Sequence, residues 1–497
     1  MLRVAFHNLG CKVNAYETER MIQSFSDAGY EIADFEAEAD IYVINTCTVT
    51  NIADRKSRQM LSRARAMNPE ALVVACGCYV ETRTGQGSRK GAPGSKGTEQ
   101  PENPDKAGAG ADSGGRADIL ILNNEKKDIV EIVEQYIRKG TSVSRETNSD
   151  NKYYGCQTEE RAGEDGQLRA LHDHTRAYVK IQDGCDQFCS YCIIPMARGR
   201  VRSRRPGEII KELEALAANG IKEAVLTGIH LSSYGIDFSQ NENGNVNGRV
   251  SYNQRAMTGE YVNRELIEVI RRAAEIEGIE RIRLGSLEPR IITEEFLSAV
   301  KENPKVCPHF HLSLQSGSDT VLKRMNRHYD TEEYEKRVEM IRSCFSHPAV
   351  TTDIIVGFPG ESEAEFLETR DYLNRIGFYE THIFKYSRRK GTRAERMEGQ
   401  LTEKEKAVRA GILAEDDRER RERFRSYYFN REEEVLFEEE KQIDGERYYI
   451  GFNREYVKMA AKSEEDLTNR IIRGTTGEKV LWEQLLVFYP RLVYNKL

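Results

Sequence analysis

Short apolar runs alternate with amphipathic stretches along the first 140 residues. The apolar runs predict strands at LRVAFH (2–7), IYVIN (41–45), LVVA (72–75) and DILIL (118–122). Apolar residues at helical spacing predict helices between and after these strands, over 16–28, about 52–67 and 126–138. Strands that alternate with helices are typical of an open, parallel α/β sheet, which we expect to form a domain over residues 1–145.

A second alternating series occupies the middle of the chain. It predicts six strands separated by helical segments, at 177–182, 223–228, 280–285, 309–314, 351–356 and 380–386. Six such units indicate an open (β/α)6 barrel, a partial version of the eight-unit TIM-like barrel. We expect this barrel, with a charged helix at 402–430, to span residues 173–430. Short strand-like pieces without helical spacing predict a small all-β domain over 431–497.

Three polar stretches interrupt these patterns. Residues 85–116 consist largely of Gly, Ser, Pro and Lys and predict a disordered insertion, because almost nothing apolar is available to pack. Residues 146–172 read as a linker between domains, and 239–262 as an insertion in the second unit of the barrel.

Composition narrows the class of protein. No apolar run approaches the ~20 residues of a membrane span, and the N-terminus lacks the features of a secretory signal, so we expect a cytoplasmic protein without membrane contact. Ten cysteines, several of them clustered, then read as metal or cluster ligands more readily than as disulfides. The net charge of -7 argues against nucleic-acid binding over the whole surface, although a local basic patch would escape this test.

The stretch DGCDQFCSYC (183–192) places Cys185, Cys189 and Cys192 as C-x-x-x-C-x-x-C after the first barrel strand. Three thiolates suit an iron–sulfur cluster with one iron left open. The alternative is half of a zinc ribbon, which needs a fourth donor at close spacing, and the next cysteine downstream is Cys307. The loop follows a strand's carboxyl end, where barrel enzymes place their chemistry. The residues alone leave both readings open.

A second set of cysteines is spread along the N-terminal domain. Cys11, Cys47 and Cys78 each follow a predicted strand. Parallel strands bring their carboxyl ends to one edge of a sheet, so the three thiols can meet there. The alternative is three separate buried cysteines, since free cysteine is among the most buried residue types.

The first motif, with Tyr191 directly before its last cysteine, resembles the signature of the radical SAM superfamily. The resemblance implies a 4Fe-4S cluster whose open iron binds S-adenosylmethionine, and one-electron cleavage that yields a 5′-deoxyadenosyl radical. It also implies cofactor-binding positions at strand ends, namely Tyr191, Thr227, Gly228, Glu288, Ser313, Gln315 and Gly357. His230 is either a pocket residue or a structural histidine.

The strings LGCKVNAYETE (9–19), INTCTVTNIADRKSRQ (44–59) and CGCY (76–79) resemble the cysteine motifs of the methylthiotransferase family. That resemblance implies a second 4Fe-4S cluster on Cys11, Cys47 and Cys78, with S-adenosylmethionine acting as methyl donor as well as radical source. It also implies that the last domain is the RNA-binding TRAM domain. Cys76 is assigned no ligand role, and Cys156, Cys307 and Cys344 are expected to be structural.

Two further strings, LTGIHLSSYG and HLSLQSGSDTVLKRMNRHY, are similar to the bacterial branch that acts on N6-threonylcarbamoyladenosine (t6A) at tRNA position 37. The implied reaction converts C2–H of the adenine into C2–S–CH3, with no side chain needed as acid or base. The alternatives are another tRNA adenosine, a ribosomal-protein side chain, or, in another class, a non-catalytic zinc-bearing protein that binds RNA.

A basic run follows the first motif. ARGRVRSRR (197–205) carries five arginines that can contact phosphate or simply form a solvated loop, namely Arg198, Arg200, Arg202, Arg204 and Arg205. The acidic strand EEEVLFEEE leaves only another face of the last domain for RNA. Expected partners are tRNA and an electron donor such as flavodoxin or ferredoxin, and the chain is expected to be a monomer.

Overall fold

The computed structural model describes residues 1–84, 116–138, 175–238, 252, 262–482 and 484–491. The predicted linker lies outside these residues, as do nearly all of the predicted insertions at 85–116 and 239–262. The chain divides into two compact units. The first comprises Met1–Leu168, Cys192–Arg200 and Arg388–Gly391, and the second comprises Arg169–Tyr191, Val201–Ser387 and Thr392–Leu497.

The first unit is built on a five-stranded parallel sheet of order β2-β1-β3-β4-β5. The strands are β1 (Arg3–Asn8), β2 (Glu31–Ala33), β3 (Ile41–Thr46), β4 (Leu72–Gly77) and β5 (Ile119–Ile121). Every residue of β3 is buried, as expected for the central strand of a sheet covered on both faces. The four predicted strands are confirmed, and β2 was missed because it is short and partly exposed.

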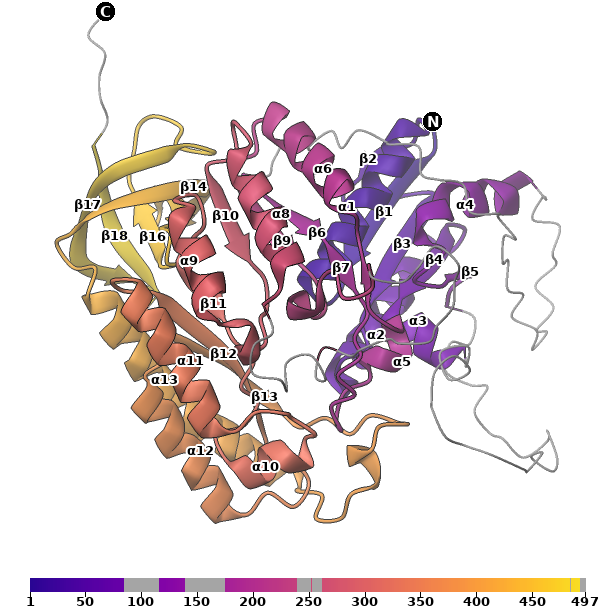
Figure 1. Cartoon of the computed structure of the whole chain (residues 1–497). Helices are drawn as coiled ribbons and strands as arrows, with labels where there is room; N and C mark the ends of the chain where they lie inside the picture. Colours follow the sequence, from indigo (N-terminus) through magenta and orange to yellow (C-terminus); the bar gives the residue numbers. More distant parts are fainter. Residues whose placement is uncertain (85–115, 139–174, 239–251, 253–261, 483, 492–497) are drawn as a thin grey trace, which may run out of the picture. The chain divides into compact units, whose positions relative to one another are not determined.

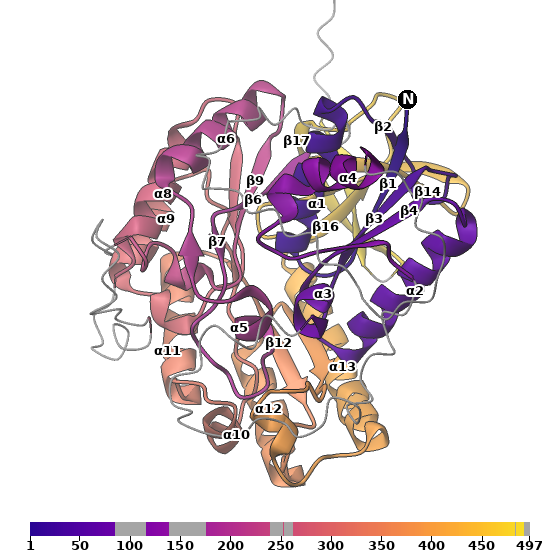
Figure 2. The same ribbon diagram turned by 90° about the vertical axis from the view of Figure 1, so that its right-hand side faces the viewer.

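Helices cover both faces of this sheet (Figure 2). Apolar residues of α1 (Lys12–Asp27) and α4 (Ile129–Arg138) pack on one face, and those of α2 (Asn51–Met67) pack on the other. Helix α1 begins four residues before its predicted start, so Cys11 is its N-cap residue. Short helices complete the unit, namely α3 (Cys78–Arg83), the 3-10 turn η3 (Lys126–Asp128) and α5 (Ile194–Arg198).

The second unit contains two three-stranded parallel sheets, β10-β9-β6 and β11-β12-β13. Parallel bridges from Ile282 to Val306 and from Leu287 to Leu312 join them into one curved row of six strands in chain order. This row is the open six-stranded barrel that the sequence predicts. The strands are β6 (Arg176–Lys180), β9 (Glu223–Thr227), β10 (Arg281–Leu284), β11 (His309–His311), β12 (Ala349–Val356) and β13 (Glu380–Lys385).

Helices cover the convex side of this row (Figure 1). They are α6 (Pro206–Ala218), α8 (Arg264–Glu275), α9 (Glu294–Glu302), α10 (Asp319–Arg324), α11 (Thr331–Cys344), α12 (Glu363–Ile376) and α13 (Glu403–Ser426). Capping boxes fix the starts of α12 and α13, because Ser362 and Thr402 each pair with a glutamate three residues later. Short elements complete the loops, namely β7 (Gln182–Asp183), β8 (Arg202–Ser203), η4 (Leu231–Ser233), η5 (Pro289–Ile291) and η6 (Ala394–Arg396). Among the described residues no helix has the length and apolarity needed to cross a membrane.

The C-terminal segment closes into a five-stranded barrel of order β14-β15-β16-β18-β17, drawn in yellow in Figure 1. Its strands are β14 (Glu432–Ile443), β15 (Glu446–Phe452), β16 (Lys458–Ala461), β17 (Ile471–Leu481) and β18 (Leu485–Pro490). Inward-facing residues such as Phe437, Met459 and Leu486 form its core, and Phe424 of α13 packs against the same cluster. The predicted all-β domain is therefore confirmed as a closed barrel.

Buried arginines connect the two barrels of the second unit. Arg283 lies 2.8 Å from Glu223, and its second nitrogen donates to the backbone oxygen of Arg454 in the C-terminal segment. Arg176 lies 3.6 Å from Glu223 and 2.8 Å from Glu438 of β14. Burial raises the pKa of Glu223, but the three neighbouring arginines together lower it below its usual value. The acidic strand thus provides partners for buried cations, which the sequence did not reveal.

We expect Glu223→Gln to lower the free energy of unfolding of the second unit by about 3 kcal/mol at pH 7, because it leaves Arg283 buried without its carboxylate. Since the pKa of Glu223 is lowered, the carboxylate contributes fully above pH 4.5 and loses its contribution as the pH falls through the folded-state value. Denaturant unfolding at several pH values measures both effects. The control Glu268→Gln removes an exposed pair with Arg271 and should cost less than about 1 kcal/mol. Equal losses in the two variants would contradict the assignment.

Candidate functional site

The three cysteines of the first unit meet at the carboxyl edge of its sheet. Cys11 follows β1 and caps α1, Cys47 follows β3, and Cys78 opens α3 directly after β4. These strands are neighbours in the sheet. Burial raises the pKa of the Cys47 thiol to about 11, and the nearby thiols of Cys78 and Cys11 contribute to the same shift. The three sulfur atoms are therefore close enough to interact electrostatically.

Gly10 allows the backbone to pass close to the side chain of Cys47. Gly10 has φ +115°, and a Cβ there would lie 3.1 Å from the sulfur of Cys47. Any side chain at this position would enter the space beside the thiols and would also strain the backbone. Asn14 fixes the loops, because its amide donates to the backbone oxygens of Leu9 (2.7 Å) and Thr46 (3.0 Å).

A buried charge cluster lies beside this set of thiols. Glu17 of α1 accepts hydrogen bonds from Lys126 (2.6 Å) and from Arg198 (2.9 Å), and all three residues are buried. Burial raises the pKa of Cys78, while Arg198 and Lys126 act in the opposite direction. Cations beside a thiol favour the thiolate, the form that binds iron. Sequence reasoning missed Glu17 and Lys126, since nothing in the local pattern distinguishes them from surface charges.

A second buried ion pair holds the loop that follows Cys47. Arg389 lies 2.9 Å from Asp54 of α2 and donates to the hydroxyl of Thr48 and to the side chain of Asn51. The side chain of Arg389 is largely buried, so this arginine is part of the first unit's interior.

Cys185, Cys189 and Cys192 of the first motif lie on the continuous loop between β7 and α5. Gln182 shapes the start of the loop by donating to the backbone oxygens of Asp183 (2.9 Å) and Gly184 (2.7 Å). Ser190 anchors the middle, because its backbone N–H donates to Met325 (2.9 Å) and its carbonyl accepts from Ala394 (2.8 Å). The loop that carries Cys185 and Cys189 is therefore held on both sides.

Arg327 is a site residue that sequence reasoning did not single out. It is half-buried and donates to the sulfur of Cys189 at 3.3 Å and to the hydroxyl of Tyr329 at 3.0 Å. A guanidinium beside a thiol favours the thiolate. The string that contains Arg327 was noticed for its family resemblance, but only the fold brings this arginine to Cys189, 138 residues away.

The positions expected to bind S-adenosylmethionine lie at or just beyond strand ends. Thr227 ends β9, and Gly228 follows it so closely against Gln182 that a Cβ would come within 2.8 Å of the Gln182 amide oxygen. Gly357, with φ +70°, follows β12, and its N–H donates to Glu361. Tyr191 packs against a small apolar cluster that includes Met325 and Phe358.

Three other expected positions follow β10 and β11. Glu288 is buried, accepts a hydrogen bond from Tyr252 at 2.6 Å, and has its pKa raised by burial. Ser313 is half-buried, and its carbonyl accepts from Tyr329 at 2.5 Å. Gln315 is buried with φ +75°. Their roles in binding S-adenosylmethionine stay predictions.

His230 lies in the loop after β9 with its Nδ1 2.6 Å from the hydroxyl of Ser233. Burial, together with Arg327, lowers its pKa to about 3. The imidazole is therefore neutral at physiological pH, and His230 provides a hydrogen-bonding group and no positive charge.

The five arginines of the basic run do not share one environment. Arg198 is buried against Glu17, which does not fit the phosphate contact expected from the sequence. Arg204 is partly buried and pairs with Glu212. Arg200 is half-buried, while Arg202 and Arg205 are exposed and remain candidates for RNA contact. A run of arginines looks the same in sequence whether its members are solvated or paired.

Two segments of the chain match known families. Residues 179–373 match the radical SAM superfamily, and residues 3–92 match a family described as "Uncharacterized protein family UPF0004". A solved radical S-adenosylmethionine methyltransferase, TsrM from Kitasatospora setae, is 13% identical to this chain with a TM-score of 0.47. The matched region covers 77% of this chain and 73% of the TsrM chain.

Curated relatives match over most of the chain. The threonylcarbamoyladenosine tRNA methylthiotransferase MtaB of Bacillus subtilis is 37% identical over 95% of this chain and 93% of its own length. A tRNA-2-methylthio-N(6)-dimethylallyladenosine synthase of Caldicellulosiruptor saccharolyticus is 33% identical over 80% of this chain and 74% of its own. On this identity and coverage, the chain belongs to the methylthiotransferase family of radical SAM enzymes.

Proposed function

We propose that this protein methylthiolates C2 of N6-threonylcarbamoyladenosine at position 37 of tRNA. The observation that carries the proposal is the near full-length similarity to MtaB, at 37% identity, in a chain that has both three-cysteine sets. The dimethylallyladenosine synthase is similar at lower identity and over less of the chain, which favours the threonylcarbamoyl substrate.

We assign one 4Fe-4S cluster to Cys185, Cys189 and Cys192 and a second to Cys11, Cys47 and Cys78. The donor chemistry fits, because each set offers three thiolates and leaves one iron for another ligand. The space that Gly10 leaves beside Cys47, and the cations near Cys78 and Cys189, also fit thiolate-bound clusters. When bound, the clusters and S-adenosylmethionine supply the electron, the radical and the methylthio group of the reaction.

The chain's own residues contribute positioning and electrostatics. Arg327 donates a hydrogen bond to the sulfur of Cys189. The amide nitrogen of Gln182 donates to the cysteine loop, and its amide oxygen accepts from the backbone N–H of His230. Arg202 and Arg205 are exposed and supply positive charge for tRNA phosphates. We further propose that the protein acts as a monomer and receives electrons from a flavodoxin or ferredoxin.

Deletion of the gene should remove 2-methylthio-N6-threonylcarbamoyladenosine from cellular tRNA and leave the unmodified threonylcarbamoyladenosine in its place. Mass spectrometry of tRNA nucleosides measures both species. Re-expression should restore the product. If the deletion instead removes the methylthio group of 2-methylthio-N6-dimethylallyladenosine, the protein acts on dimethylallyladenosine. Unchanged tRNA nucleosides would point to a protein substrate.

Replacing Cys185, Cys189 or Cys192 with Ala should abolish reductive cleavage of S-adenosylmethionine and lower the iron content from about eight to about four per chain, as loss of one cubane cluster requires. Replacing Cys11, Cys47 or Cys78 should lower iron equally but leave cleavage largely intact while methylthiolation stops. Cleavage assays, iron analysis and nucleoside analysis are run on the same anaerobic preparations.

The matched control is Cys344→Ser, a half-buried cysteine outside both sets, which should change neither iron nor cleavage. Loss of cleavage in all six variants would show that the N-terminal cysteines are needed for folding, and would contradict the division of roles.

Arg327→Gln should lower the reduction potential of the cluster on Cys189, because the substitution removes a cation and a hydrogen bond from a ligand sulfur. Redox titration followed by electron paramagnetic resonance measures the shift. Arg324→Gln is the control, since this arginine pairs with Glu365 of α12 instead. An unchanged potential with intact iron content would show that Arg327 acts only in packing.

A further inference from the structure

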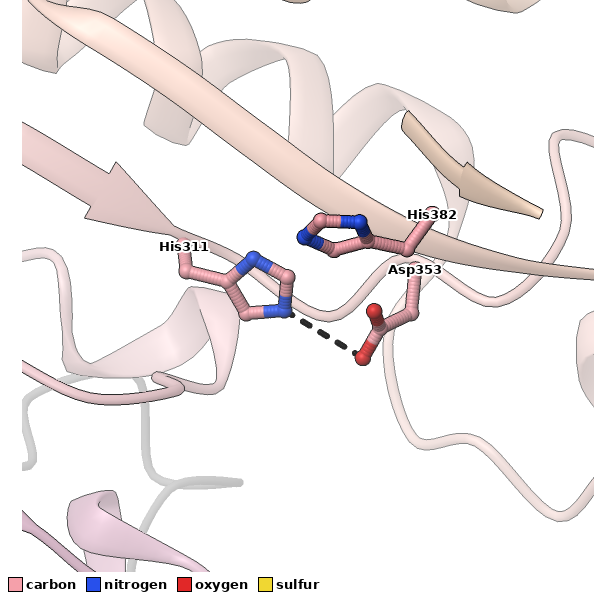
Figure 3. Close-up of side chains that lie close together, drawn as sticks. All are labelled: His311, Asp353 and His382. Atoms are coloured by element: carbon pink, nitrogen blue, oxygen red, sulfur yellow. Dashed lines mark ion pairs between the residues drawn. The ribbon is translucent and has the colours of Figure 1, made fainter. Parts of the chain in front are cut away.

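Three potential metal ligands on neighbouring strands of the second unit lie close together, and none is a cysteine. They are His311 at the end of β11, Asp353 in β12 and His382 in β13 (Figure 3). One ligand atom from each can be chosen so that all three atoms lie within 4.8 Å of one another.

Strand register places the three side chains on one face. His382 is the direct partner of Asp353 across the β12–β13 pair, and His311 is the partner of Thr351, two residues before Asp353. Thr352 faces the helices, since its hydroxyl lies 3.4 Å from the hydroxyl of Tyr334 on α11. Because successive side chains of a strand alternate, Asp353 faces the opposite side.

This face can be reached from solvent. The side chain of His311 is 12% exposed and that of Asp353 is 26% exposed, while His382 is exposed. The His311 and His382 ring centres are 5.5 Å apart, and in Figure 3 both rings lie beside the Asp353 carboxylate. An ion can therefore enter without unfolding of the sheet.

Two polar contacts orient the ring of His311 toward Asp353. Its Nδ1 lies 2.9 Å from the hydroxyl of Thr351, and its Nε2 lies 3.2 Å from an oxygen of Asp353. With its proton on Nδ1, the ring donates to Thr351 and turns the lone pair of Nε2 toward the carboxylate. Such a hydrogen bond from the far ring nitrogen is the usual support of a metal-binding histidine.

The distance between Nε2 of His311 and the Asp353 oxygen, 3.2 Å, fits a bridging metal ion as well as a shared proton. A shared proton involves only His311 and Asp353, whereas a metal ion also uses His382, whose ligand atom lies within 4.8 Å of both. A zinc ion with bonds of about 2.0–2.1 Å holds its donors about 3.3 Å apart, close to the observed 3.2 Å. Rotation of the exposed His382 side chain can close the larger separations.

We propose that His311, Asp353 and His382 bind one divalent transition metal ion of the zinc and iron(II) class. Two imidazoles and one carboxylate suit these ions and leave positions open for water or another ligand. The site uses none of the six cysteines, so it extends the proposed function and does not depend on it.

The test uses the full-length protein with both cysteine sets loaded with iron and sulfide, equilibrated anaerobically with zinc at buffered free concentrations. We expect one zinc per chain beyond the iron. X-ray absorption at the zinc edge should show nitrogen and oxygen neighbours at about 2.0–2.1 Å with the outer-shell pattern of imidazole, and no sulfur at about 2.3 Å.

Asp353→Asn and His382→Gln should each weaken zinc binding at least tenfold, because even loss of a supporting hydrogen bond costs about 10–100-fold in metal affinity. Thr351→Val, which preserves the shape of the side chain, should weaken binding within that range by releasing Nδ1 of His311. The matched controls are Asp371→Asn, an exposed carboxylate of α12, and His7→Gln in the first unit, and both should bind zinc like the unaltered chain.

Thermal unfolding without zinc and iron content establish that each variant is folded. The proposal is overturned if the loaded protein binds no additional zinc, if the bound zinc has sulfur neighbours, or if Asp353→Asn and His382→Gln bind it as tightly as the controls. The first outcome would leave His311 and Asp353 as a simple ion pair, and the tRNA nucleoside measurement would remain valid in either case.

Discussion

Parallel pairing of strands determines where chemistry can occur in this chain. In the first unit, β1, β3 and β4 all run in the same direction, so the residues that follow them, including Cys11, Cys47 and Cys78, arrive at one edge of the sheet. The second unit repeats the arrangement with six parallel strands, and its cysteine loop, Thr227 and Gly357 all follow strand ends. Residues far apart in sequence become neighbours through backbone hydrogen bonding alone, and side chains then refine their positions.

Cations beside cysteine sulfurs are the second common feature. Lys126 and Arg198 meet at Glu17 beside Cys78, and Arg327 donates to Cys189. Burial alone favours the neutral thiol, as the raised pKa of Cys78 shows. A nearby positive charge offsets part of that cost and so favours the thiolate that a cluster requires. Cys78 is therefore shielded from water while the neighbouring cations favour its anionic form.

The sequence could predict what depends on local pattern. Apolar runs located β1, β3, β4 and β5 of the first unit and the six barrel strands of the second. Spacing singled out Cys185, Cys189 and Cys192, whereas the N-terminal cysteines were singled out by their places after predicted strands and by the family resemblance. The sequence could not predict contacts set by register or by long-range packing. The burial of Arg198 depends on Glu17, 181 residues earlier, and the grouping of His311, Asp353 and His382 depends on the alignment of three strands. Helix α1 was placed four residues late because Cys11 carries none of the usual capping side chains.

Two short segments of the chain supply buried cations to the first unit. Residues Cys192–Arg200 and Arg388–Gly391 belong to the first unit, although both segments are flanked in sequence by the second. They bring Arg198 to Glu17 and Arg389 to Asp54, which are the buried ion pairs beside the N-terminal thiols and their loops. The N-terminal sheet thus obtains two of its buried cations from the part of the chain that matches the radical SAM superfamily, or from just beyond it.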